Sequence, residues 1–245
     1  MRAGIFDLDG VITNTAKIHF AAWKQTFDEF LQSYSQQQQK PQRPFIEEDY
    51  ILYVDGKPRI GGIRSFFKSR NISIPLGSSQ DDPEAMTLHG VAKKKQAIFI
   101  ELVNMKGVPL FDSTIRFIHQ LIDNDVKTAI VSSSKNCEMI LNKAGIEDLF
   151  LARLDGMSLD KLGLAGKPQP DLFLEAGRRI DVKPQDAFIV EDALSGVRAG
   201  KAGGFGLVIA IDRSGDMEKS FLDNGADIVI NDMGDMTMSD VAKMM

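Results

Sequence analysis

The chain has 245 residues, 43% of them hydrophobic and 26% charged, which is the balance of a soluble globular protein with one large domain or a core plus a smaller domain. A net charge of −5 argues against nucleic-acid binding, and no apolar run approaches the roughly 20 residues that span a membrane. A single cysteine, which excludes an internal disulfide, and the absence of a signal-peptide pattern predict a cytoplasmic protein, which we expect to be monomeric.

The first dozen residues join a short apolar run to two carboxylates. Residues 3–6 are too few for a free-standing helix, and Gly10 follows at strand length, so we predict a buried strand of a parallel sheet. Asp7 and Asp9 then lie on the same side of the chain at the carboxyl end of this strand, where open α/β sheets bind ligands. Carboxylates so close need a cation, a shared proton or a positive neighbour. A divalent metal with a phosphate-bearing substrate would meet this need; a solvated Asp-Gly turn is the alternative.

The next part of the chain has a helical pattern. Apolar spacing predicts an amphipathic helix over about residues 15–33, followed by a solvated polar loop from Ser33 to Pro41. Short helical patterns continue from Glu47 to Met105 without sustained strand alternation. We therefore predict a small helical domain inserted between the first two strands of the sheet.

From Pro109 onwards, strand and helix patterns alternate. Ser113 is a plausible cap for a helix that reaches Ile122, and the Met-rich end is expected to be a packing segment or a frayed tail. Further helices are predicted at 137–144, ended by Gly145, and at 170–180, and strands at 128–131, 187–190, 207–211 and 226–230. This alternation predicts an α/β fold with a doubly wound parallel sheet, the core being residues 1–14 and 109–245 and the helical cap residues 15–108.

Polar residues follow the predicted strands again further along the chain. Ser132 comes after the strand at 128–131, and Glu191 and Asp192 come after the strand at 187–190. Lys167 lies between them, in the segment Gly-Lys-Pro-Gln-Pro-Asp.

Together with the Asp-x-Asp-Gly-x-x-Thr segment at residues 7–13, these residues resemble the four ordered motifs of the haloacid dehalogenase (HAD) superfamily of phosphohydrolases. The resemblance covers nearly the whole chain and is closest to the β-phosphoglucomutase branch, through residues 6–16 and 19–24. It implies a Rossmann-like HAD core with an inserted α-helical cap.

The resemblance also implies a catalytic mechanism. Asp7 would be the nucleophile that forms an aspartyl-phosphate, and Asp9 the general acid and base for the leaving and entering oxygens. Ser132 and Lys167 would bind the phosphoryl oxygens. An acid at position 9 is typical of the phosphatases and phosphomutases and argues against dehalogenation. Cys137 lacks the context of a catalytic thiol.

A Mg²⁺ cofactor is implied at the same edge of the sheet. The resemblance assigns its ligands to Asp7, the main-chain oxygen of Asp9, and Asp192, with Glu191 acting through water. These are oxygen ligands, which suit a hard divalent cation.

The cap is expected to act as a lid that carries substrate-reading residues. Gly56 and Arg59 have the spacing of the Gly-x-x-Arg loop of the β-phosphoglucomutase branch, in which Arg59 would bind a distal phosphate; a surface turn is the alternative. His19 and Lys95 also match cap residues of that branch, although a structural histidine and a solvated lysine run are open alternatives. The full set of expected substrate-binding residues is Thr15, His19, Gly56, Arg59, Lys95, Ser133, Lys135 and Asn136.

The sequence also departs from the mutases of that branch. Asp55 stands where they have a lysine, Gly62 replaces a serine and Asn14 replaces an acid. The substrate class expected is a sugar phosphate, but mutase and phosphatase chemistry remain alternatives. A phosphatase for another small phosphomonoester, and a phospho-acceptor or binding module without turnover, are further alternatives. A lid and an acid at position 9 count against the last.

Overall fold

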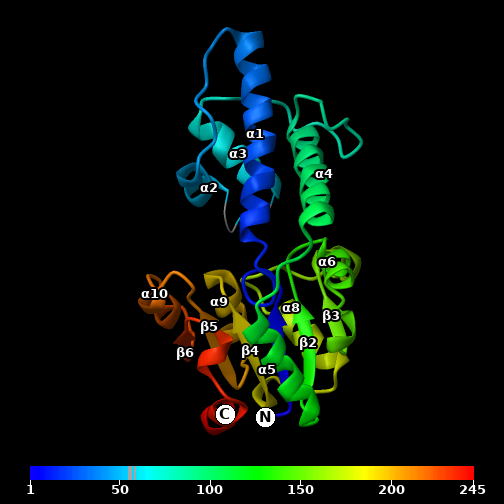
Figure 1. Cartoon of the computed structure of the whole chain (residues 1–245), viewed down its shortest axis with the longest axis vertical. Coiled ribbons are helices and arrows are strands. Elements are labelled where there is room, and N and C mark those ends of the chain that lie inside the picture. The colour runs from blue at the N-terminus through cyan, green and yellow to red at the C-terminus, as the bar shows by residue number, and fades with distance from the viewer. Residues whose placement is uncertain (55–56, 58) are drawn as a thin grey trace. The chain divides into compact units, whose positions relative to one another are not determined.

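The computed structural model describes residues 1–54, 57 and 59–245, which form two compact units. The core unit comprises Met1–Thr15 and Val108–Met245, and the cap unit comprises Ala16–Gly107 (Figure 1). None of the helices within these described residues is long and apolar enough to cross a membrane.

A six-stranded, all-parallel sheet in the order β3-β2-β1-β4-β5-β6 forms the centre of the core unit. The chain builds outwards from β1 to β3 and then returns to the other side of β1 with β4. The strand order therefore switches between β1 and β4, and ligands of such sheets bind at the carboxyl ends of the strands beside this switch. The predicted parallel α/β sheet is confirmed. Its strands are β1 (Ala3–Asp7), β2 (Lys127–Val131), β3 (Ala152–Leu154), β4 (Ala187–Glu191), β5 (Leu207–Ile211) and β6 (Ile228–Ile230).

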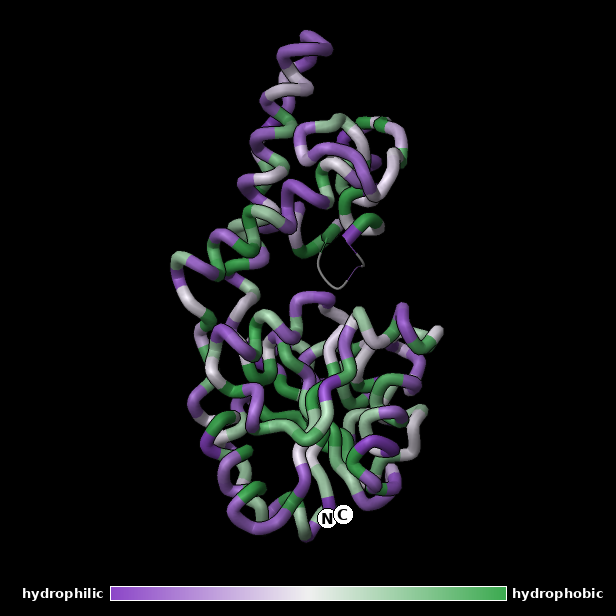
Figure 2. Tube along the Cα trace, turned by 90° about the vertical axis from the view of Figure 1, so that its right-hand side faces the viewer, coloured by the Kyte–Doolittle hydropathy of each residue, from purple (hydrophilic) through white to green (hydrophobic). Residues whose placement is uncertain are grey.

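Helices cover both faces of the sheet, as a doubly wound fold requires. Ile5 belongs to one apolar cluster with Phe173 of α8, whereas Phe6 packs against Phe188, which contacts Phe117 of α5. Because both faces are covered, β5 is apolar throughout and β1 is apolar up to Asp7, and Figure 2 shows the hydrophobic interior that such strands form. The helices of this unit are α5 (Asp112–Asp123), α6 (Cys137–Ala144), α7 (Gly156–Leu162), α8 (Asp171–Arg179), α9 (Leu194–Ala202), α10 (Glu218–Asp223) and α11 (Met238–Met244), with short 3-10 helices η1 (Glu147–Leu149), η2 (Pro184–Asp186) and η3 (Met233–Asp235).

The cap unit is helical, as predicted, and is held by an aromatic core. Phe27 of the first helix lies at its centre, with the ring centroids of Trp23, Phe45, Phe66 and Phe67 at 4.4–5.6 Å. Such aromatic pairs stabilise a small core beyond the area that they bury. The helices of the cap are α1 (Ala16–Gln38), α2 (Glu47–Tyr53), α3 (Arg59–Ser69) and α4 (Leu88–Lys106).

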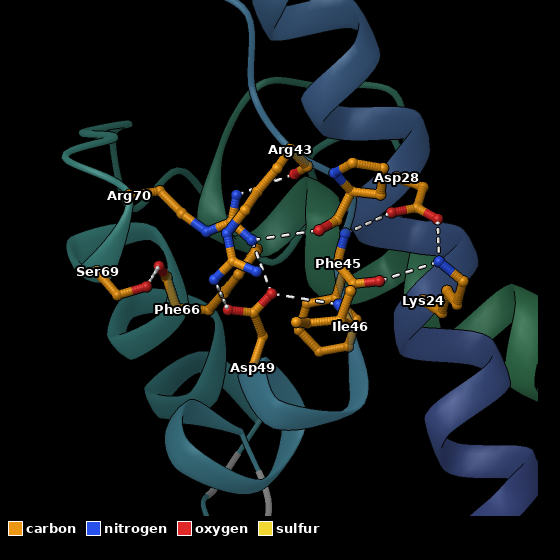
Figure 3. A network of polar contacts seen from close by, with 10 residues as sticks. Lys24, Asp28, Arg43, Phe45, Ile46, Asp49, Phe66, Ser69 and Arg70 are labelled. Atoms are coloured by element: carbon orange, nitrogen blue, oxygen red, sulfur yellow. Dashed lines mark hydrogen bonds and ion pairs between the residues drawn. The ribbon is translucent and has the colours of Figure 1, made fainter.

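A polar network fixes the segment that joins α1 to α2 (Figure 3). Asp49 is buried and accepts hydrogen bonds from Arg43 at 3.0 Å and from Arg70 at 2.7 Å. Asp28 of α1 accepts the backbone N–H of Phe45 at 2.8 Å. The buried carboxylate is thus paired on both oxygens, which an ionised group at this depth requires.

The first helix is longer than predicted. It continues to Gln38, so the prediction of a loop from Ser33 was wrong for residues 33–38. Glutamine is a good helix former, and the Ser33 hydroxyl donates to the carbonyl of Glu29 at 3.1 Å instead of breaking the helix. The helix ends before Gln39, which has a positive φ of 50°.

The start of α5 also differs from the prediction. The helix begins at Asp112 with Phe111 as its N-cap, so Ser113 lies inside the first turn and is not the cap. Its side chain forms a hydrogen bond with Asp232 instead. The helix at Cys137–Ala144 does end at Gly145 as predicted, in the left-handed conformation.

Candidate active site

Three buried charges meet at the carboxyl ends of β1 and β4. Asp7 ends β1 and Glu191 ends β4. The ammonium of Lys167 donates to Asp7 Oδ1 and, at 2.5 Å, to Glu191 Oε1. The three side chains are at most 10% exposed. A lysine 160 residues away in sequence from Asp7 is therefore held between two carboxylates of neighbouring strands.

The environment changes the acidity of these groups. Burial raises the pKa of Asp7 above its ordinary value, and the negative charges of Glu191 and Asp9 raise it further, whereas Lys167 opposes this rise. The pKa of Lys167 is raised: burial acts against this, but the charges of Asp7 and Glu191 outweigh it. Burial also raises the pKa of Asp192 well above its ordinary value, with Glu191 and Asp7 adding to the effect. This edge of the sheet thus concentrates negative charge that only further positive charge or protons can balance.

Asp9 lies two residues beyond Asp7, in the loop after β1, and its carboxylate is oriented by two threonines. The Thr15 hydroxyl donates to Asp9 Oδ1. The Thr13 hydroxyl lies 3.4 Å from the same oxygen and 3.1 Å from the Thr15 hydroxyl. Both threonines are fully buried. The structure therefore places Thr15 against Asp9, and the part of Thr15 in substrate binding stays a prediction.

Glycines make room for Glu191, which ends β4, and for Asp192, which follows it. Gly10 has φ +86°, and a Cβ on it would lie 1.7 Å from Asp192 Oδ2. A Cβ on Gly196, in α9, would lie 1.8 Å from Glu191 Oε1. The carboxylate of Asp192 therefore lies directly against the loop that carries Asp9.

Glu191 has partners on both of its oxygens. Oε1 accepts from Lys167, and Oε2 accepts the backbone N–H of Ala193 at 2.7 Å. With both oxygens engaged, its direct effect is to hold the ammonium of Lys167 in place.

The loop after β2 carries the second predicted motif. Ser132 is buried, and its hydroxyl accepts the backbone N–H of Ser134 at 3.0 Å. Asn136 is also buried, whereas Ser133 and Lys135 are exposed. Lys135 forms an ion pair with Asp160 at the surface. The sheet register brings Ser132 beside the site, because its neighbour Val131 lies next to Asp7.

The cap holds its predicted residues on α1, α3 and α4. Lys95 is buried, and its ammonium lies 2.9 Å from His19 Nδ1 and 4.5 Å from the centre of the Phe99 ring, so a solvated lysine run does not describe it. Arg59 donates at 2.5 Å to Gln96 Oε1. Gly56, like Asp55, lies outside the described residues.

The donor set fits a divalent cation in chemistry. Among the described residues, no three histidine, cysteine or acidic side chains already converge as a metal site. Asp7, Asp9 and Asp192 nevertheless carry carboxylate oxygens at one edge of the sheet, where burial and then the neighbouring acidic charges raise the pKa values of Asp7 and Asp192. Hard, oxygen-rich, acidic sites of this kind suit Mg²⁺.

Comparison with known proteins agrees with this geometry. A sequence model of the haloacid dehalogenase-like hydrolases matches residues 1–204. The chain belongs to this family. It is 39% identical to β-phosphoglucomutase of Mycobacterium bovis over 239 residues, covering 96% of this chain and 91% of that protein. It is 25% identical to the phosphorylated carbohydrates phosphatase of Thermotoga maritima, with 92% of each chain covered.

Solved structures give the same result for the fold. The crystal structure of β-phosphoglucomutase from Clostridium difficile superposes with a TM-score of 0.77 at 21% identity, covering 100% of this chain and 96% of that one. The prediction of an HAD enzyme of the phosphatase and phosphomutase type, similar to β-phosphoglucomutase, is thereby confirmed.

Some residues of the site were missed in the sequence. Thr13 belongs to the first motif, but its contact with Asp9 follows from the fold of the loop. Gly196 is the third residue of α9, and glycine has a low helix propensity. That unfavourable position was the available signal that something packs closely against it.

Proposed function

We propose that this HAD-family chain is a monomeric, cytoplasmic, Mg²⁺-dependent enzyme that transfers phosphoryl groups of sugar phosphates through an aspartyl-phosphate on Asp7. The observation that carries the proposal is the buried Lys167 between Asp7 and Glu191. A cation held there can bind a phosphoryl oxygen beside the nucleophile and offset the charge that a phosphate adds. Interconversion of β-glucose 1-phosphate and glucose 6-phosphate is the first candidate reaction, because a relative at 39% identity is named β-phosphoglucomutase.

The proposed first step uses two carboxyl groups with different roles. A carboxylate oxygen of Asp7 attacks phosphorus, a bond from phosphorus to Asp7 forms, and the bond from phosphorus to the sugar oxygen breaks. Asp9, in its protonated form, gives its proton to that leaving oxygen. Thr13 and Thr15 hold the Asp9 carboxyl in one orientation for this transfer. Ser132 and Lys167 bind the oxygens of the phosphoryl group.

The second step reverses these roles. Asp9, now ionised, takes the proton from an entering hydroxyl, and that oxygen attacks phosphorus while its bond to Asp7 breaks. A sugar hydroxyl gives the mutase reaction, and water gives the phosphatase reaction. The difference between the two reactions is therefore which nucleophile enters.

We propose Asp7, the main-chain oxygen of Asp9, and Asp192 as the residues that hold Mg²⁺. When bound, the ion supplies positive charge that stabilises the transferring phosphoryl group. Glu191, whose two oxygens accept from Lys167 and Ala193, is proposed to act through water.

Hydrolysis of a sugar phosphate is the second candidate function. It is favoured by Asp55, which replaces a lysine of the mutases, and by the similarity to a phosphatase of phosphorylated carbohydrates. Arg59, His19 and Lys95 are proposed to bind the substrate in either case, since they place three basic groups on the cap.

The test is an assay with β-glucose 1-phosphate, a trace of glucose 1,6-bisphosphate and Mg²⁺, in which glucose 6-phosphate and free phosphate are followed together. Fast glucose 6-phosphate with little free phosphate is the expected result. A predominance of free phosphate would replace the mutase by the phosphatase. Absence of both products, with no hydrolysis across a panel of sugar phosphates, would refute the proposed substrate class.

A further inference from the structure

Arg213 contacts the loop after β1 from outside the catalytic cluster. It lies two residues beyond β5, and its Nε–H donates to the carbonyl of Gly10 at 2.8 Å. Its Nη1 lies 3.0 Å from Asp232 Oδ2, and its guanidinium carbon is 3.2 Å from the centre of the Phe111 ring. One planar side chain thus joins the loops after β1, β5 and β6 to the segment that precedes α5.

The partners of Arg213 are themselves fixed. Asp232 accepts the backbone N–H of Gly234 at 2.8 Å, as the cap of η3. The backbone N–H of Phe111 donates to the carbonyl of Ile12 at 2.9 Å. An arginine suits this position, because it can stack on a ring while its separate N–H groups reach a carbonyl and a carboxylate.

The carbonyl of Gly10 depends on this contact. In the loop after β1, the carbonyl of Leu8 accepts from the backbone of Ile12 and Thr13, and the carbonyl of Thr13 accepts the N–H of Gly10. The carbonyl of Val11 accepts from the buried hydroxyl of Thr114. The carbonyl of Gly10 is held by the partly exposed guanidinium instead. Removing that donor would take away a bond that stabilises the closed loop, so that the loop and its backbone hydrogen bonds would open more easily.

The position of Gly10 affects two acidic residues of the site, one next to it in the chain and one packed against it. Asp9 precedes it directly, and the carboxylate of Asp192 packs against its α-carbon, with no room for a Cβ. We propose that Arg213 is a positioning residue of the active site, which fixes the Gly10 peptide and through it the orientation of Asp9. This inference rests on the proposed function for the role of Asp9 but not for the contact itself.

The experiment compares Arg213→Gln and Arg213→Lys with Arg198→Gln as the control. Arg198 is another arginine of the core unit, which donates to Asn224 at the surface. Hydrogen exchange of the peptide covering residues 8–14 is measured in each variant. Arg213→Gln should exchange about tenfold faster there than the wild type, since one charged hydrogen bond is lost. Arg213→Lys should fall between them, and Arg198→Gln should match the wild type.

Turnover supplies the second readout. With phenyl phosphate and p-nitrophenyl phosphate as probes, Arg213→Gln should lower kcat about tenfold for phenyl phosphate and less for p-nitrophenyl phosphate, with KM nearly unchanged. The difference is expected because the poorer leaving group needs the proton of Asp9 more. A general structural defect would lower both rates alike.

The possible results are distinct. Wild-type exchange and wild-type rates in Arg213→Gln would overturn the proposal, as would equal losses for both probes. Faster exchange in a protein whose wild type turns over neither these probes nor β-glucose 1-phosphate would support the contact and count against the proposed function. If Arg213→Gln does not fold, Asp232→Asn decides: faster exchange of residues 8–14 supports the proposal, and unchanged exchange contradicts it.

Discussion

Replacing Lys167 by methionine removes the ammonium from between Asp7 and Glu191 while keeping a side chain of similar length. Both carboxylates then face each other in a site where they are at most 10% exposed. Removing one partner from a buried ion pair costs about 3–5 kcal/mol of unfolding free energy, because the other charge stays buried without compensation. For a chain of this size, that corresponds to a fall in Tm of roughly 6–20 °C.

Lys201→Met is the matched control. Lys201 forms an ion pair with Asp227 at 3.2 Å, and both side chains are more than a third exposed. Loss of such a surface pair costs about 0–1 kcal/mol. A third variant, Lys167→Met with Glu191→Gln, removes one of the two opposed charges and should recover part of the stability without recovering turnover.

The assay is urea unfolding at pH 7.5 in EDTA, followed by circular dichroism, with turnover of a phosphate monoester measured on the same samples. Lys167→Met should lose several kcal/mol more than Lys201→Met and should have at least a hundredfold lower kcat. Equal losses of stability in Lys167→Met and Lys201→Met would refute the reasoning, because Lys167 would then not compensate two buried charges.

Three further predictions test other parts of the molecule. Gly10→Ala should lower kcat at least a hundredfold, since the added Cβ would lie 1.7 Å from Asp192 Oδ2. Gly145→Ala is the control, because Gly145 also has a positive φ but open space around it, and this variant should keep full turnover. Equal kinetics of the two variants would contradict the prediction. Asp49→Asn should destabilise the cap by about 3 kcal/mol in thermal unfolding, because Arg43 and Arg70 would lose the buried carboxylate with which they form ion pairs. An unchanged melting curve would be evidence against this prediction. Burial, with Lys95 and Arg59, lowers the pKa of His19, so the native state binds fewer protons than the unfolded state and loses stability as pH falls below about 6.5. His19→Gln should lose less stability than the wild type between pH 7.5 and 5.5 in urea unfolding, and equal losses would show that His19 does not titrate in this way.

The positions of the strands could be predicted because strands buried on both faces are short, continuous apolar runs. Residues 207–211 are an example, and the strand has those bounds. Asp7 and Glu191 could be placed together for the same reason, since the carboxyl ends of parallel strands share one edge. The edge strand β3 was missed, because three residues with a half-buried arginine between two apolar residues carry little pattern.

The ends of two helices and the partners of Arg213 depend on contacts that cannot be predicted from the sequence. The ends of α1 and α5 were predicted from local preferences, whereas the glutamine run stayed helical and Ser113 bonded to Asp232. The same holds for Arg213, whose partners come from segments about 20 to 200 residues away in the chain. The sequence does not distinguish one exposed arginine from another, so the bond of Arg213 to the carbonyl of Gly10 could be found only from the fold.

The most direct test of the account is whether a phosphoryl group becomes attached to Asp7. The protein is mixed with β-glucose 1-phosphate labelled with ³²P and Mg²⁺, quenched in acid and, after removal of the acid, digested briefly with trypsin near neutral pH. Trypsin cuts after Arg2 and Lys17, so the peptide of residues 3–17 contains Asp7 and Asp9 as its only acids. The account predicts label in this peptide that hydroxylamine releases and that Asp7→Asn abolishes. Turnover without any labelled peptide, or label that persists in Asp7→Asn, would contradict it.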